Sequence, residues 1–440
     1  MRIEQFQANE IEGLVNEDNG LVSRLLFTDE TLYQLEQQRV FTRTWLYLAH
    51  ETEIPNNGDF VTRWMGEDPV IVVRGTDGVV RAFLNSCPHR GTLICRADVG
   101  SAGGFVCPYH GWSFSNTGAL TALAYEPDYY EGHLRADELG LFEVAQLDIY
   151  NELIFATWNA DAPSLDDYLG NSKWYLDIYF GRTPAGMEVL GRPHRWMMQG
   201  NWKLGAINFA ADGPHATHVH GPITERLAGI PPQVIGDLLA HSPAFCLDNG
   251  HNGIFTLLPE DGPQWLGCLP ELVALYEQVL DPHQQYYLSK MISGVQTQFP
   301  NMSWVQAPIS LGDNQPPVMF LALRVWNPRG PELTEIYDWF LVEKEAPQEY
   351  KDAVLKAGLR TFSLGGTFDQ DDAEAWAGIS RGIHGEIGRS RPMNFQATLA
   401  FRDKEVKDFP GPGRVYQSTY AEMTEFDVLR EWKRRMIAGA

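Results

Sequence analysis

The sequence has few cysteines and few positive charges, and each shortage excludes a class of protein. Five cysteines in 440 residues are too few for a secreted scaffold stapled by disulfides. Lys and Arg number 34 against 57 Asp and Glu, which gives a formal net charge of −23 at pH 7. So acidic a chain lacks the basic surface that binding to nucleic acid or to an anionic membrane requires. We therefore expect neither of these partners.

Long apolar runs are also missing. The most apolar stretch, residues 318–323, is ended by Arg324, whereas a transmembrane helix needs about 20 apolar residues. The first ten residues, MRIEQFQANE, do not contain the apolar core of a secretory signal. These observations predict a cytoplasmic protein without a membrane span.

Strand-like and helix-like segments follow one another in a way that predicts an α+β protein. Residues 20–45 carry an apolar stripe typical of a helix, with Thr28 or Asp29 as its cap. Over the next hundred residues, β-branched and aromatic segments such as FVTRW, DPVIVVRG and LIFATW alternate with turn residues, which predicts short antiparallel strands. Further on, strands are expected at 318–326 and 334–343, and helices at 346–360 and 426–436. We expect a small all-β domain followed by a larger α+β domain.

Two short segments repeat one pattern of cysteine and histidine. Residues 87–91 read Cys-Pro-His-Arg-Gly and residues 107–112 read Cys-Pro-Tyr-His-Gly-Trp, so each loop offers one thiolate and one imidazole. Unrelated buried residues do not explain the repetition, and Cys2His2 zinc sites usually keep like ligands together in the sequence. In a Rieske [2Fe–2S] centre, one iron takes two cysteines and the other takes two histidines. The pattern therefore favours a Rieske cluster with the ligands Cys87, His89, Cys107 and His110.

A second group of candidate ligands lies near the middle of the chain, where Asp212, His215, His218 and His220 fall within nine residues. Two histidines and one carboxylate with open positions are the ligand set of mononuclear non-haem Fe(II). On a regular helix His215 and His218 share a face. His215 and His220 converge only if the helix ends or distorts between them. Spacing alone leaves both pairs open.

These motifs resemble those of the α-subunits of Rieske aromatic ring-hydroxylating dioxygenases, and the resemblance covers about residues 20–435. It rests on CPHRG and CPYHGW, on Asn201-Trp202-Lys203 with the spaced Asn, Asp and His residues that follow, and on the segment 359–376. It implies a catalytic domain built on an antiparallel sheet with helices, similar to helix-grip folds. We divide the chain into an N-terminal helical segment that packs with the catalytic domain (1–40), a Rieske domain (41–158) and the catalytic domain (159–440).

The resemblance also assigns metal ligands. It implies that the two cysteines bind one iron of the cluster and that the two histidines bind the other. It places a mononuclear Fe(II) on His215, His220 and Asp372. His218 remains a rival ligand or a residue of the substrate pocket, and Asp369 and Asp371 are expected to be exposed acids at a helix N-terminus.

Asp212 has two possible roles. The resemblance implies that it accepts hydrogen bonds from His110 of another subunit and from His215, so that electrons pass between the two metal centres, with Asn208 beside this path. The alternative is a local helix cap.

The implied reaction is the O2-dependent cis-dihydroxylation of an aromatic ring, in a pocket that includes Phe209, Phe362 and Phe368. Bicyclic or polycyclic hydrocarbons are favoured because no Arg or Lys lies within the motif segments expected to line the site. The alternative is a Rieske monooxygenase that hydroxylates an aromatic acid such as salicylate. A Rieske electron carrier is disfavoured, because it needs only about 100 residues and no second iron.

No flavin or nicotinamide motif is visible, so the electrons are expected to come from a ferredoxin or a reductase. Arg90 and Arg96, beside the cluster ligands, are candidates for docking an acidic ferredoxin. By analogy with the family, we expect a small β-subunit and an α3β3 or α3 oligomer.

Overall fold

The computed structural model describes residues 6–124, 130–131, 133–135, 138–228, 231–312 and 315–438. The chain forms two compact units, which are described separately. One unit is Phe41–Leu165, and the other combines Met1–Val40 with Asp166–Ala440. Within the described residues, no helix combines the length and hydropathy needed to cross a membrane.

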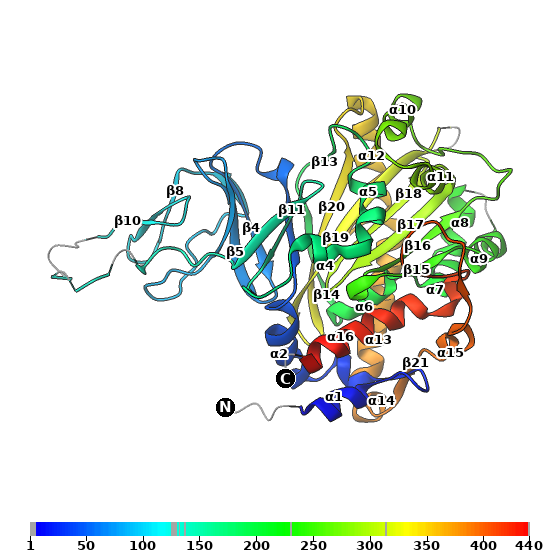
Figure 1. Cartoon of the computed structure of the whole chain (residues 1–440), viewed down its shortest axis with the longest axis horizontal. Coiled ribbons are helices and arrows are strands. Elements are labelled where there is room, and N and C mark those ends of the chain that lie inside the picture. Colours follow the sequence, from blue (N-terminus) through cyan, green and yellow to red (C-terminus); the bar gives the residue numbers. More distant parts are fainter. Residues whose placement is uncertain are drawn as a thin grey trace. The chain divides into compact units, whose positions relative to one another are not determined.

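The smaller unit is built from short antiparallel strands in three sheets (Figure 1). The first sheet has the order β6-β5-β4-β7, with β4 (Asp59–Met65), β5 (Asp68–Arg74), β6 (Val80–Leu84) and β7 (Val99–Ser101). The second has the order β10-β9-β8, with β8 (Gly104–Val106), β9 (Ser113–Ser115) and β10 (Leu120–Ala122). The third has the order β11-β12-β3, with β3 (Leu46–His50), β11 (Gln146–Tyr150) and β12 (Leu153–Thr157). The segments FVTRW, DPVIVVRG and LIFATW therefore form strands as expected.

The larger unit is organised around one antiparallel sheet with the order β13-β20-β19-β18-β17-β16-β15-β23-β22, and β14 also pairs with β20. Its strands are β13 (Met187–Val189), β14 (His194–Gln199), β15 (Ala244–Cys246), β16 (Asn252–Leu257), β17 (Met291–Gln298), β18 (Met302–Ile309), β19 (Val318–Gly330), β20 (Leu333–Glu343), β22 (Glu405–Val406) and β23 (Arg414–Tyr416). The two longest strands, β19 and β20, are the ones expected from the sequence, and both are buried along almost their whole length.

Helices accompany this sheet. The ones that position candidate residues are α6 (Trp202–Asn208), α7 (Gly213–His218), α12 (Gln348–Thr361), α13 (Thr367–His384) and α16 (Met423–Ala438). Helix α12 contacts β19 and β20, and α16 contacts α6, β15 and β16. The other α-helices among the described residues are α1 (Ala8–Leu14), α2 (Glu30–Glu36), α4 (Leu165–Leu169), α5 (Lys173–Phe180), α8 (Gly221–Ala228), α9 (Pro232–Ala240), α10 (Pro270–Val279), α11 (Pro282–Lys290), α14 (Glu386–Arg389) and α15 (Ala397–Phe401). The α+β class expected from the sequence is correct.

The prediction of a single helix over residues 20–45 is wrong in part. Leu21–Ser23 forms strand β2, which pairs with β1 (Val15–Asn16) and with β21 (Pro392–Asn394). The Ser23 hydroxyl then caps a 3-10 turn, and the Asp29 carboxylate accepts the backbone N–H of Leu32 and caps α2. Two caps so close together start two separate helical segments instead of one.

The N-terminal segment is anchored in the larger unit through Glu36, which is fully buried. Its carboxylate accepts hydrogen bonds from the indole N–H of Trp202 at 2.9 Å and of Trp432 at 2.7 Å, and it pairs with Lys203. A buried ion pair is tolerated when its remaining hydrogen-bonding capacity is filled in this way. The contact ties α2 to the start of α6, which precedes the histidine segment.

Candidate metal centres

The two Cys–Pro segments of the smaller unit fold into nearly identical turns. In the first, the Cys87 N–H donates to the Thr92 carbonyl at 2.9 Å, and the Gly91 N–H donates to the Cys87 carbonyl at 2.7 Å. The second loop repeats both contacts, from Cys107 to Trp112 at 2.7 Å and from Gly111 to Cys107 at 3.0 Å. The glycines take φ of 77° and 73°, a region that favours residues without a Cβ.

The turns bring the two cysteines together and the two histidines together. Cys87 and Cys107 are buried, and the His89 and His110 rings lie 4.5 Å apart between centroids. Burial alone would raise the pKa of Cys107, but the backbone N–H groups of Tyr109 and His110 outweigh it and lower that pKa. Backbone N–H groups stabilise a thiolate, the form that binds iron.

His89 is held by packing rather than by a hydrogen bond. Its ring stacks on Trp112, with 4.8 Å between centroids and 4° between planes. Its Nδ1 atom is buried, and no hydrogen-bond partner for it is found among the described residues. An orphaned imidazole nitrogen on a ring that adjoins the His110 ring fits a ligand of the [2Fe–2S] cluster.

A second set of ligand atoms converges in the larger unit. The Nε2 atoms of His215 and His220 lie 3.0 Å apart, and they lie 2.7 and 3.0 Å from Oδ1 of Asp372. Neighbouring ligands about 2.1 Å from one octahedral ion are separated by about 3.0 Å. The donor set of two imidazoles and one carboxylate therefore fits one ferrous ion in both chemistry and spacing.

Local structure explains why these side chains meet. The Asp212 carboxylate accepts the His215 backbone N–H at 3.1 Å and starts α7, and Pro214 lies in the first turn. Because α7 ends at His218, His220 leaves the helical path and can approach His215. Asp372 comes from α13, far along the chain.

The carboxylate of this site is held in the charged form that binds a cation. Burial would raise the pKa of Asp372, but His215 and His220 hold that pKa well below its usual value. Burial would also lower the pKa of His215, yet the Asp372 carboxylate raises it. The Asp372 carboxylate is therefore ionised, as a metal ligand must be.

The other histidine and aspartate candidates from the sequence differ in their exposure to solvent. His218 and Asp371 are exposed, and His218 does not belong to the converging group of three. Asp369 was expected to be an exposed acid, and this is wrong: it is only 1% exposed. The reason is that it pairs with a buried arginine, Arg324.

Of the three candidate pocket phenylalanines, Phe368 contacts the histidine site directly. Phe368 packs edge-to-face on His220 with 5.0 Å between ring centroids, and it stacks on Phe362 at 5.2 Å. Phe209 is buried and packs on Trp326 at 5.3 Å. An aromatic wall therefore adjoins one of the three convergent side chains.

One buried charged residue, Arg324 in strand β19, contacts the candidate pocket residues but belongs to none of the sequence motifs. It is fully buried, and its guanidinium lies over the rings of Phe209 and Phe362 at 5.1 and 5.5 Å. The signal in the sequence was a single arginine within the apolar run of residues 318–326, because an unpaired charge is rarely buried there.

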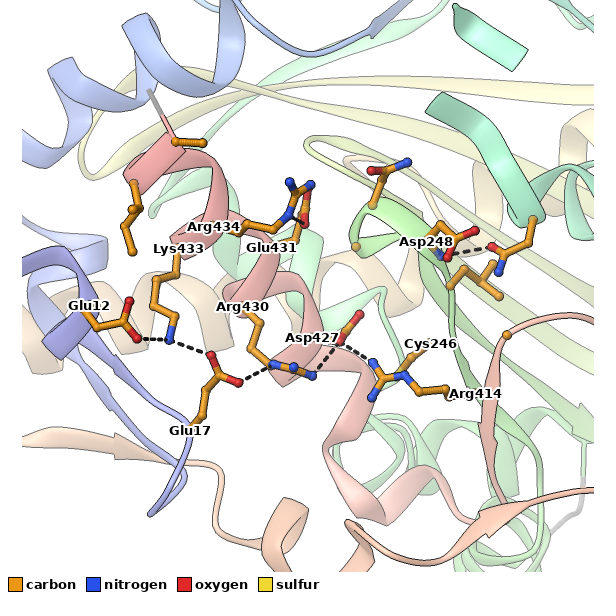
Figure 2. Close-up of a pocket in the computed structure, with 17 residues that line it drawn as sticks. Glu12, Glu17, Cys246, Asp248, Arg414, Asp427, Arg430, Glu431, Lys433 and Arg434 are labelled. Carbon is orange, nitrogen blue, oxygen red and sulfur yellow. Dashed lines mark hydrogen bonds and ion pairs between the residues drawn. The ribbon is translucent and has the colours of Figure 1, made fainter. Parts of the chain in front are cut away.

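A cavity of about 710 Å³ lies elsewhere in the larger unit and contains none of the candidate ligands (Figure 2). Six of its charged side chains form one continuous chain of ion pairs in the order Glu12, Lys433, Glu17, Arg430, Asp427 and Arg414, and Glu431 pairs separately with Arg434. Because these charges already neutralise one another, the cavity offers little to a charged ligand. The contacts instead join the N-terminal segment to α16.

Comparison with known proteins agrees with this arrangement. A family model described as the Rieske [2Fe-2S] domain matches residues 44–130. The α-subunit of biphenyl 2,3-dioxygenase from Rhodococcus jostii (strain RHA1) is 36% identical over 98% of this chain and 92% of its own length. The α-subunit of benzene 1,2-dioxygenase from Pseudomonas putida is 35% identical over 98% of this chain and 95% of its own. The crystal structure of naphthalene 1,2-dioxygenase from Rhodococcus sp. bound to indole is 36% identical, covers 98% of both chains and superposes with a TM-score of 0.92.

This similarity over nearly the whole length defines an enzyme of the Rieske non-haem iron oxygenase class. The chain belongs to the α-subunits of the Rieske aromatic ring-hydroxylating dioxygenases. A simple Rieske electron carrier is thereby excluded.

Proposed function

We propose that this α-subunit catalyses the O2-dependent cis-dihydroxylation of an aromatic hydrocarbon, with bicyclic or polycyclic rings favoured. The observation that carries the proposal is the convergence of His215, His220 and Asp372 within hydrogen-bonding distance of one another. These residues would hold Fe(II), and when bound the ion supplies open positions at which O2 reacts beside the substrate. The protein contributes ligand geometry and substrate orientation.

The surroundings of the site favour a hydrocarbon over an aromatic acid. Phe362 and Phe368 present stacked aromatic surface next to His220. The nearby cation, Arg324, forms two contacts with the Asp369 carboxylate and so offers no free charge to a substrate carboxylate. The monooxygenation of an aromatic acid such as salicylate is therefore the second candidate function. The dioxygenase relatives named for biphenyl, benzene and naphthalene support an aromatic hydrocarbon as the substrate.

Electrons would enter at a [2Fe–2S] cluster held by Cys87, His89, Cys107 and His110. We propose that they come from a ferredoxin or reductase and that they cross to the iron site of a neighbouring subunit through Asp212. In the structure, one Asp212 oxygen caps α7, and the other accepts from the Asn208 amide at 3.4 Å. The cap and the bridge are thus compatible roles. An α3 core, completed by β-subunits as α3β3, would provide the neighbouring subunit.

Metal analysis tests the ligand assignment. We expect three irons and two sulfides per α-subunit, because the cluster holds two irons and the histidine site one. His220→Ala should lose one iron per chain while the Rieske absorption remains, because only the histidine site is damaged. The matched control, His218→Ala, should keep all three irons because His218 is exposed and lies outside the group. Loss of iron from His218→Ala with retention in His220→Ala would overturn the assignment.

A further inference from the structure

Arg324 contacts residues at the ends of three different helices. Its Nη1 and Nη2 atoms lie 2.7 Å from the two carboxylate oxygens of Asp369, in the first turn of α13. Its guanidinium also lies over the rings of Phe209 and Phe362, the residues that terminate α6 and α12. One side chain on a central strand therefore joins the segments that carry a candidate iron ligand and the pocket wall.

The geometry of the Arg324–Asp369 pair restricts motion of α13. The guanidinium contacts the carboxylate at two points, through a hydrogen bond from Nη2 to Oδ2 and an ion pair between Nη1 and Oδ1. Two points of contact define an orientation as well as a distance, unlike the single contact of a lysine ammonium. Asp369 and Asp372 are three residues apart on one helix, so both project from the same face. Fixing Asp369 against β19 therefore fixes the turn from which Asp372 reaches the two histidines.

The Arg324 guanidinium is itself held in place by a residue of the neighbouring strand. Arg324 lies directly opposite Asp338 on β20, with Nε 3.4 Å from the Asp338 carboxylate. Burial disfavours a charged Arg324, but Asp369 and Asp338 outweigh this effect and raise its pKa, so the guanidinium remains charged. The pair is thus anchored to the two longest strands of the sheet.

We propose that Arg324 is a positioning residue that sets the iron affinity of the His215, His220 and Asp372 site through Asp369. This inference rests on the proposed function, because it needs Fe(II) at that site. It assigns a role to a residue that is not itself one of the three ligands. Residues that orient metal ligands typically change metal affinity by about 10–100-fold when they are replaced.

The test measures Fe(II) release from the assembled enzyme after a ferrous chelator is added in excess, with the Rieske absorption followed in the same sample. Arg324→Lys and Arg324→Met should release the mononuclear iron about 10–100-fold faster than the wild type. Asp369→Asn should act in the same direction. The double variant Arg324→Met/Asp369→Asn should be little faster than the faster single variant, because both changes break one interaction.

A matched control separates positioning from general loss of stability. Arg182 is also fully buried, and its Nε donates to Glu343 at 2.7 Å, but neither residue belongs to the iron site. Arg182→Met should therefore weaken the fold while Fe(II) release stays at the wild-type rate. Equal acceleration in Arg182→Met and Arg324→Met would overturn the proposal.

The direction in which the rate of Fe(II) release changes also tests the proposal. If Arg324 acted only through its charge, removing a cation near Fe(II) would slow the release of iron. Unchanged or slower release in the Arg324 variants would thus refute the positioning role. If Arg324→Met fails to fold, Arg324→Lys and Asp369→Asn give the same comparison. A wild type without mononuclear iron would instead refute the proposed function itself.

Discussion

His251 is fixed in its neutral form by two backbone groups. Its Nδ1 accepts the Phe299 N–H at 3.0 Å, and its Nε2 lies 3.0 Å from the Tyr168 carbonyl, to which it donates. Protonation would place a second N–H against the Phe299 N–H. Burial, opposed by the Tyr168 carbonyl and assisted by Arg435, lowers the pKa of His251 to about 3.

The low pKa makes stability depend on pH in a defined direction. Below about pH 6.5 the unfolded chain binds a proton at His251, but the folded chain does not do so until about pH 3. Stability should thus fall as the pH falls, by about 1.4 kcal/mol per pH unit from this group alone. His251→Gln can keep both hydrogen bonds without titrating. The thermal unfolding midpoint of the wild type should drop more steeply than that of His251→Gln between pH 7 and pH 5, and parallel curves would contradict this.

The roles of some single residues could not be predicted from the sequence alone. Asp369 and Asp372 have the same side chain and lie one turn apart, so composition and spacing cannot tell which of them faces the histidines. The family pattern pointed to Asp372, and the structure brings Asp372 to His215 and His220. The burial of Asp369 depends on Arg324, 45 residues away in the sequence, and no local pattern encodes that contact.

At the level of elements, the end of α7 decides the histidine geometry. The Asp212 cap starts the helix, which ends at His218, so His215 and His220 can converge although a regular helix would separate them. The sequence showed that a break was required for this pair, but not that it occurs. Strands and long helices with strong apolar patterns, such as β19, β20, α12 and α16, could be predicted. The segment 20–45 could not, because its short strand depends on pairing with distant β21.

Asp212→Asn separates capping from electron transfer. Asparagine caps a helix about as well as aspartate, so α7 and both metal centres should be retained. The loss of the negative charge should block the proposed transfer between subunits. We expect reduced clusters to stay reduced when substrate and O2 are mixed with this variant in a single-turnover experiment. Rapid oxidation of the cluster would refute the bridge.

At the level of the whole molecule, the net charge of −23 opposes docking of an acidic electron donor. The exposed residues Arg90 and Arg96 flank the candidate cluster ligands and would supply local positive charge. Arg90→Gln/Arg96→Gln should raise the apparent KM for ferredoxin several-fold, and the difference from the wild type should shrink at high salt. Arg391→Gln, at an exposed arginine in the larger unit, is the matched control. An unchanged KM would remove both residues from the docking surface.

The most direct test of the proposed reaction is product analysis with labelled oxygen. The assembled α- and β-subunits, a ferredoxin and a reductase would be supplied with a bicyclic hydrocarbon such as naphthalene or biphenyl under 18O2. We expect a cis-dihydrodiol that carries two labelled atoms, because both oxygen atoms add to one ring. A product with one labelled atom would contradict the dioxygenase function and favour monooxygenation.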